Sequence, residues 1–86
     1  REAEIVLDHD RRFIRLAIEE AHRAREAGNE PFGAVLVKDG ILAAFGRNQV
    51  VTRNDPTYHA ELGLIRDFCR EKGVRDLSGY TLYSSW

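Results

Sequence analysis

Residues 31–46 read PFGAVLVKDGILAAFG and have the composition of two short strands joined by a turn. The apolar run 32–37 has no polar alternation and is bounded by turn residues, so it predicts a strand buried on both faces. Residues 39–40 are Asp-Gly, which tolerates the positive φ angles of a two-residue hairpin turn. Residues 41–46 have the composition of a returning strand. We therefore expect residues 32–48 to form a β-hairpin.

An amphipathic helix is expected before the hairpin. Apolar residues recur there at three- and four-residue steps, with arginines and glutamates between them. This periodicity predicts a helix at about residues 10–27. Asp8 or Asp10 is its candidate N-cap, and Gly28-Asn29 its candidate stop. Residues 1–9 show no sustained period and are interpreted as a lead-in.

A second helix and a third strand follow the hairpin. Residues 47–56 are polar and predict a loop, and apolar residues at helical spacing predict a helix at about 57–71, with Pro56 at its start. Residues 80–85 have strand composition. The order α-β-β-α-β predicts an α/β fold with a mixed sheet flanked by helices. The strands are too apolar for two helices to cover, so something else should cover the other face of the sheet. This favours a truncated domain or an oligomer.

Composition excludes several classes of protein. The chain has 86 residues and a mass of 9.8 kDa, and a globular chain of that mass buries roughly 64% of its surface, enough for one core. Its 13 Lys+Arg against 14 Asp+Glu give a net charge of −1, which disfavours a dedicated electrostatic binder of nucleic acid. No run approaches the ~20 apolar residues of a membrane-spanning helix. The single cysteine, Cys69, excludes an internal disulfide and any CxxC motif within these residues.

The residues suited to chemistry lie in the stretch 54–61, which reads NDPTYHAE. His59 and Glu61 lie at the start of the second helix, where both side chains can converge on one point beyond its N-terminus. A histidine there offers a ring nitrogen to a metal, and the carboxylate can hold a water at the same metal. His-x-Glu is a short pattern, however. The alternatives are a glutamate that complements the helix dipole and a hydrogen-bonded, half-buried histidine.

Further segments fall in the order and approximate spacing of one protein family. They are Pro31–Val37, Asn48 within Gly46-Arg47-Asn48, Asn54–Thr57 and Thr81–Ser85. With His59-Ala60-Glu61, they make the chain resemble the cytidine-deaminase-like superfamily of zinc deaminases. Within it, the chain is similar to the branch of guanine deaminases and tRNA adenosine deaminases. The resemblance runs from about Phe13 to Trp86, and it implies a cytidine-deaminase-like fold.

The resemblance implies a role for each matching residue. His59 matches the zinc-binding histidine, and Glu61 matches the proton shuttle between the attacking water, the ring and the leaving amine. Asn48 matches an asparagine that orients the base or its sugar, and Phe32 an aromatic that packs on the substrate ring. The Ala60 N–H would help hold the attacking oxygen or the exocyclic group of the substrate. A turn asparagine at Asn48 and a plain core aromatic at Phe32 are the alternatives.

The chain departs from the family pattern at Tyr58, at Trp86, where the family usually has threonine or another small residue, and in one missing segment. Tyr58 occupies a position that is normally small, which implies a reshaped pocket floor or a contact with an oligomeric neighbour. The Pro-Cys-x-x-Cys segment is absent, because the chain ends at Trp86, where that segment should begin. Cys69 lies in mid-helix and is no convincing substitute. We therefore expect residues 1–86 to be part of one deaminase domain, truncated before its cysteine-bearing helix, with two zinc ligands beyond Trp86.

Several functional hypotheses remain open at this point. The first is zinc-dependent hydrolytic deamination of a purine base or nucleoside, with release of ammonia. Guanine is the first choice because residues 54–57 and 82–85 look more like that branch. A tRNA adenosine deaminase is less favoured, since such an enzyme would profit from a basic face. The others are an inactive deaminase-like module for assembly or binding, and a zinc site completed by a second chain. A homodimer in the cytosol, without membrane contact, is expected.

Overall fold

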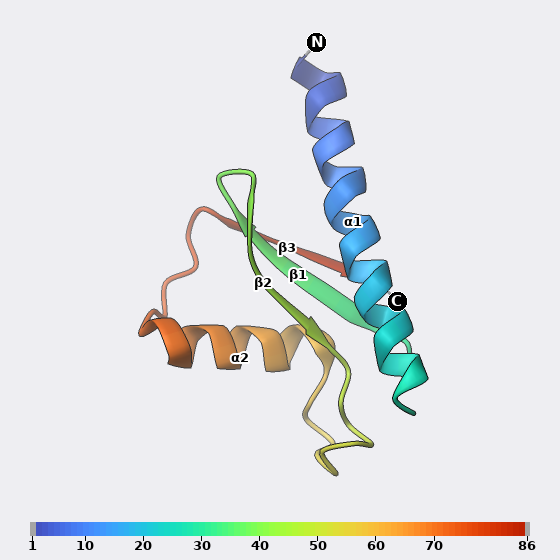
Figure 1. Cartoon of the computed structure of the whole chain (residues 1–86). Coiled ribbons are helices and arrows are strands. Elements are labelled where there is room, and N and C mark those ends of the chain that lie inside the picture. Colours follow the sequence, from blue (N-terminus) through green and yellow to red (C-terminus); the bar gives the residue numbers. More distant parts are fainter. Residues whose placement is uncertain (1, 86) are drawn as a thin grey trace.

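The computed structural model describes residues 2–85, with side chains from residue 10 onward. Its elements are α1 (Glu2–Glu26), β1 (Gly33–Lys38), β2 (Ile41–Arg47), α2 (Ala60–Lys72) and β3 (Tyr80–Ser85). The strands form one sheet in the order β2-β1-β3. The two helices lie on opposite faces of this sheet (Figure 1). The predicted α/β fold and its order of elements are confirmed.

The hairpin of β1 and β2 forms as the sequence predicts. Asp39 and Gly40 adopt φ angles of 53° and 74°, the pair of left-handed residues that a tight two-residue turn requires. The register shifts between Leu36 and Val37, which pair with Ala44 and Leu42. The residue between those partners is the extra residue of a β-bulge.

The sheet is antiparallel over the described strands, and the expected mixed sheet is not found there. β1 pairs antiparallel with β2 on one side and with β3 on the other. β2 and β3 therefore run in the same direction, and α2 connects them. They make no parallel pair, because the central strand β1 separates them.

Alternation along β1 divides its side chains between two cores. One core packs on α2 and consists of Ala34, Leu36, Ala60, Leu64 and Phe68. The other packs on α1 and consists of Phe13, Val35 and Val37. One helix thus buries each face of the central strand, as predicted for a doubly buried strand. The expectation that one face lacks a cover is wrong for β1, since two helices suffice for it.

Close contact between α1 and β1 depends on a glycine. A Cβ atom at Gly33 would lie 2.1 Å from the carbonyl oxygen of Ala17 and 2.5 Å from the backbone nitrogen of Ala21. The Ser85 hydroxyl, at the end of β3, donates a hydrogen bond to the same Ala17 oxygen at 3.2 Å. This end of the sheet is therefore fixed against α1, as Figure 1 shows.

The first helix begins earlier than expected. It starts at Glu2 rather than near residue 10, so residues 2–9 continue the helix instead of forming a lead-in. These residues include good helix formers and no glycine or proline. Asp8 and Asp10 lie inside the helix and do not cap it. Asp10 accepts a hydrogen bond from the Tyr83 hydroxyl of β3 at 2.6 Å instead.

The second helix begins later than expected, at Ala60. Asp55 Oδ1 accepts hydrogen bonds from the N–H and hydroxyl of Thr57, at 2.9 and 2.7 Å, and these bonds hold a turn just before the helix. Pro56 lies in that turn and not at the first helical position. The helix ends as predicted at Gly73, which is left-handed with φ of 66°.

Apolar side chains remain exposed on the flanking elements rather than on β1. The surface measures 6032 Å², against about 5,200 Å² for a compact protein of this mass. The more exposed apolar side chains are Ile41, Phe45, Val51 and Leu62.

Within residues 2–85, no helix has both the length and the apolar character needed to span a bilayer.

Candidate active site

The predicted site residues come from elements that meet at one end of the sheet. Gly33 pairs with Arg47 on one side and Ser85 on the other, so the start of β1 and the ends of β2 and β3 lie together. The start of α2 packs closely on this end. A Cβ atom at Gly46 would lie 3.0 Å from the carbonyl oxygen of Ala60.

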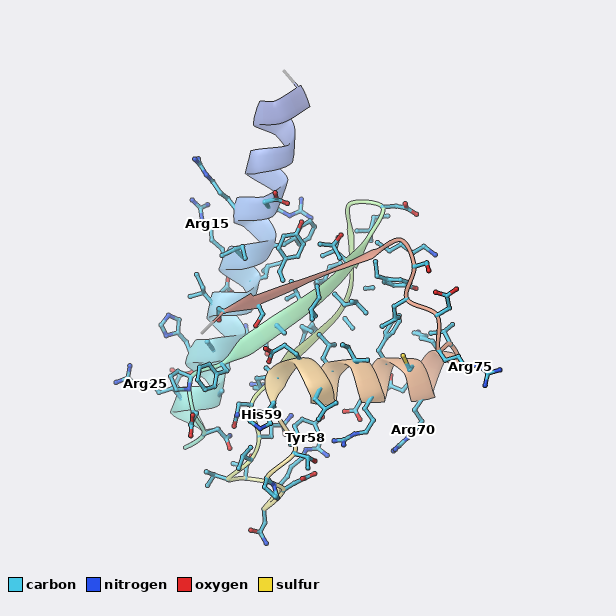
Figure 2. All side chains as sticks on the ribbon, turned by 180° about the vertical axis from the view of Figure 1, so that it is seen from behind. Arg15, Arg25, Tyr58, His59, Arg70 and Arg75 are labelled. Carbon is cyan, nitrogen blue, oxygen red and sulfur yellow. The ribbon has the colours of Figure 1, made fainter. Side chains whose placement is uncertain are left out.

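His59 is the N-cap residue of α2. Its backbone is extended, with φ of −75° and ψ of 156°, and its side chain makes no capping hydrogen bond. The residue is exposed, and Figure 2 shows it at the N-terminal end of the helix. Since the ring is not used to cap the helix, it can offer a nitrogen to a metal ion.

Glu61 lies in the first turn of α2 and is half-buried. The hydroxyl of Ser84, in β3, donates a hydrogen bond to Glu61 Oε2 at 3.1 Å. This bond connects the helix start to the end of the sheet and restricts the orientation of the carboxylate. The strand composition of residues 80–85 was visible in the sequence, but no local signal indicated this contact.

Asn48 and Phe32 are joined through their backbones, because the Asn48 N–H donates a hydrogen bond to the Phe32 carbonyl at 3.0 Å. The Asn48 side chain is buried, and its Oδ1 accepts a hydrogen bond from the Val50 N–H at 3.1 Å. Phe32 is half-buried and packs against the core cluster that contains Ala60. Asn48 thus makes the contact expected of a turn asparagine, and Phe32 packs as a core aromatic would. Both residues nevertheless lie beside the start of α2.

The backbone N–H of Ala60 is the first of α2. The first four N–H groups of an α-helix have no partner within the helix, and together they favour negative charge. The Ala60 side chain is fully buried, so its backbone is held in place. The amide thus suits the binding of a polar group at the end of the helix.

Asn29, just after α1, organises the loop that follows β2. Its buried Oδ1 accepts hydrogen bonds from the N–H groups of Val51 and Thr52, at 3.0 and 3.1 Å. Its Nδ2 donates to Thr52 Oγ1 at 3.2 Å. The sequence indicated only a helix stop at this residue. Its partners lie more than twenty residues away, so no local pattern could have identified this role.

We expect Asn29→Ala to destabilise this loop. The substitution removes the acceptor of the Val51 and Thr52 N–H groups, and a hydrogen bond of this kind contributes about 0.5–1.5 kcal/mol. Urea unfolding should show a lower midpoint, and amide exchange should be faster at residues 51 and 52. Glu30→Ala, at an exposed neighbour, is the matched control. Unchanged exchange at both amides in Asn29→Ala would contradict the assignment.

Tyr58 is turned into the protein, and its ring is buried. The ring lies on Gly63, where a Cβ atom would come within 2.6 Å of Tyr58 Cε1. Its hydroxyl donates a hydrogen bond to the Asp67 carboxylate. Arg53 and Arg66 place their guanidinium groups 4.4 and 5.5 Å from the ring centre. Burial, and then the bond to Asp67, raise the pKa of Tyr58.

A hollow of about 400 Å³ lies between β2 and α2. Tyr58 and Phe68 line it, together with the buried carboxylate of Glu20. Arg47 Nε lies 3.5 Å from Glu20 Oε1, without hydrogen-bond geometry. None of the predicted site residues lines this hollow, so we do not assign the substrate to it.

The donor set for a metal is partial in the part of the chain that the structure describes. Residues 10–85 contain no group of three or more His, Cys, Asp or Glu side chains that could hold a metal ion. Cys69 is a free, half-buried cysteine in α2. His59, with its uncapped ring at the helix start, fits one ligand position. The described part of this site therefore offers one imidazole, with a carboxylate two residues away.

A family model described as the cytidine and deoxycytidylate deaminase zinc-binding region matches residues 7–86. The chain belongs to this family. Its members are zinc-dependent deaminases, so the predicted superfamily and its enzymatic class are confirmed. The guanine deaminase of Bacillus subtilis (strain 168) is 46% identical to this deaminase-family chain over 74 residues, which cover 85% of this chain and 47% of that protein.

A tRNA-specific adenosine deaminase of Aquifex aeolicus (strain VF5) is 41% identical over 71 residues, 83% of this chain and 47% of that protein. An X-ray structure of guanine deaminase from Bacillus subtilis superposes with a TM-score of 0.81 and 45% identity, over 87% of this chain and 48% of that one. The fold class is thereby confirmed. This deaminase-family chain spans about half the length of the curated relatives it matches.

Proposed function

We propose that the chain is the N-terminal part of a zinc-dependent deaminase that hydrolyses the exocyclic amine of a purine base or nucleoside and releases ammonia. The observation that carries the proposal is the meeting of His59, Glu61 and Asn48 at one end of the sheet, where Ser84 holds the Glu61 carboxylate. Guanine is the first candidate substrate. The similarity to a guanine deaminase and the residues at 54–57 and 82–85 support this choice.

Each residue has a distinct role in the proposed reaction. Zinc bound at His59 would supply Lewis acidity, which lowers the pKa of water toward neutrality. Glu61 takes a proton from the attacking water and passes protons to the ring nitrogen and the leaving amine. The Ala60 N–H binds the attacking oxygen or the exocyclic group. Asn48 orients the base or its sugar, and Phe32 packs on the ring.

The proposed zinc site needs two further ligands, since a catalytic zinc ion is typically held by three protein side chains. We assign them to a Cys-x-x-Cys segment beyond Trp86, which itself lies outside the described residues. Residues 10–86 then form the N-terminal part of a single deaminase domain. We further propose that the protein is a homodimer in the cytosol. The exposed Phe45 and Ile41 offer apolar surface for contacts between the two subunits.

Deamination of adenosine in tRNA is the second candidate. A relative of that kind is 41% identical, and α1 carries five exposed arginines together with the exposed Glu19 and Glu26. Figure 2 shows Arg15 and Arg25 pointing away from the sheet. The exposed arginines of α1 are Arg11, Arg12, Arg15, Arg23 and Arg25. Exposed arginines suit contact with phosphates, although the whole chain has a net charge of −1.

Metal analysis and a substrate comparison test the proposal on the natural protein that contains this chain. We expect about one zinc ion per protomer, lost in His59→Ala, and ammonia release from guanine. Inosine formation in a tRNA anticodon stem-loop, with no ammonia from guanine or guanosine, would replace guanine by tRNA. A wild-type protein with neither zinc nor any of these activities would favour an inactive module instead.

A further inference from the structure

Tyr58 directly precedes His59 and is not itself a candidate ligand. We propose that Tyr58 is a positioning residue, which fixes the backbone from which His59 projects and thereby the direction of its imidazole. This inference rests on the proposed role of His59 as a zinc ligand. It explains why a bulky aromatic stands at this position and why its ring is buried rather than exposed.

The ring of Tyr58 occupies space that a glycine leaves open. Gly63 is buried in the first turn of α2, and a Cβ atom there would lie 2.6 Å from Cε1 and 2.8 Å from Cζ of the ring. The ring therefore rests directly on the helix backbone. Glycine inside a helix is unfavourable compared with alanine, so the two residues fit each other as a pair. Their contact fixes Tyr58 relative to the axis of α2.

The two ends of Tyr58 are also anchored. Its hydroxyl donates a hydrogen bond to Asp67, further along α2. Its carbonyl accepts a hydrogen bond from the Gln49 N–H at 3.0 Å. Gln49 follows Asn48, so this backbone bond links the candidate base-binding residue to the residue before the candidate metal ligand. Tyr58 thus connects the loop after β2 with the body of α2.

These anchors leave His59 between two fixed residues. Tyr58 is held on one side, and on the other side Ala60 is fully buried. The Gly63 N–H donates a hydrogen bond to the His59 carbonyl at 2.9 Å. The direction of the Cα–Cβ bond of His59 is therefore set, and only the torsions of its side chain remain. Substitution of a residue that orients a metal ligand without binding the metal itself typically weakens metal affinity by about 10- to 100-fold.

Paired substitutions distinguish positioning from simple structural support. Gly63→Ala alone should lower the urea midpoint, because the new methyl group displaces the ring. In the Tyr58→Ala background the same change should raise the midpoint, because the space is empty and alanine favours the helix. The double variant should therefore recover stability without recovering the anchors of residue 58.

Zinc affinity distinguishes the two roles. If Tyr58 were merely structural, zinc affinity would change only in step with stability. We expect Tyr58→Ala and the double variant to bind zinc about 10- to 100-fold more weakly, measured by competition with a chelator. The absorption spectrum of the cobalt-substituted protein should shift, and kcat should fall more than KM changes. Tyr58→Phe, which keeps the ring on Gly63, should retain most of the affinity.

Tyr83→Phe is the matched control, because it removes a similar tyrosine–aspartate bond, to Asp10, elsewhere in the fold. It should lower stability and leave zinc affinity unchanged. If zinc affinity follows stability across all these variants, Tyr58 is only structural and the inference is overturned. Unchanged zinc affinity in Tyr58→Ala would also overturn it.

Amide exchange in the zinc-free protein tests the inference without the metal. Tyr58→Ala should increase exchange at the amides of Gln49 and Gly63, and Tyr83→Phe should not. A wild-type protein that binds no zinc would refute the proposed function, whereas the exchange data would still decide whether Tyr58 fixes the backbone at His59. Unchanged exchange at both amides in Tyr58→Ala would refute the positioning role even if zinc is bound.

Discussion

Glu61→Gln is expected to lower kcat/KM for deamination by about 10²- to 10⁴-fold, the usual contribution of a general acid–base group. Glutamine keeps the shape of the side chain. Its amide oxygen can still accept the hydrogen bond that Ser84 donates to Glu61 at 3.1 Å. It cannot take up and release a proton near neutral pH. Since Glu61 is half-buried in the first turn of α2, we expect the fold to survive the change.

Ammonia release under steady-state conditions, with zinc content measured in parallel, checks this prediction. Ser84→Ala is the control, because it removes the hydroxyl group and keeps the carboxylate. Loss of one hydrogen bond of about 1 kcal/mol corresponds to about a fivefold decrease in rate. If Glu61→Gln kept most of the wild-type activity with its zinc in place, Glu61 would not be the proton shuttle.

Gly33→Ala is expected to destabilise the protein by about 3 kcal/mol or more, at the upper end of the range for overpacking. The new Cβ atom would lie 2.1 Å from the Ala17 carbonyl oxygen and 2.5 Å from the Ala21 nitrogen. Both are backbone atoms of α1, so no side-chain rotation relieves the clash. Either α1 or β1 must move, and the contact of Ser85 with Ala17 would then be lost as well.

Urea unfolding of the natural protein measures this effect, with Gly79→Ala as the control. A Cβ atom at Gly79 would meet nothing within 4 Å, and only its left-handed φ of 85° opposes the change. That strain amounts to roughly 1–2 kcal/mol. If Gly33→Ala were no more destabilising than Gly79→Ala, the close packing of α1 on β1 would be incorrect.

The hairpin could be predicted because its signals are local. Asp39-Gly40 specifies the turn through its own φ angles, and the apolar run before it specifies burial. The starts of the two helices were predicted less accurately than the hairpin. Residues 2–9 lack the amphipathic pattern that marked α1, yet they continue the helix. The start of α2 was displaced to Ala60 by the Asp55–Thr57 turn.

The candidate site shows the same division. His59 and Glu61 are two residues apart, so their association with one helix start was visible in the sequence. Asn29 and Ser84 were missed, because each acts on a partner that is more than twenty residues away. Tyr58 was noted only as a departure from the family pattern. Its ring contact with Gly63 became visible only once α2 was placed on the loop.

The order of the elements, the hairpin turn and the motif His59-Ala60-Glu61 could be predicted without the structure, and so could the resemblance to the family. The elements, the turn and the motif depend on residues within a few positions of one another, where backbone preference and side-chain periodicity act directly. The resemblance to the family depends on the order and spacing of several such segments. The folded structure was needed to show that the start of β1, the ends of β2 and β3 and the start of α2 meet at one place. That meeting depends on the register of the central strand and on two glycines, Gly33 and Gly46, that admit the helices, and no local pattern encodes such contacts.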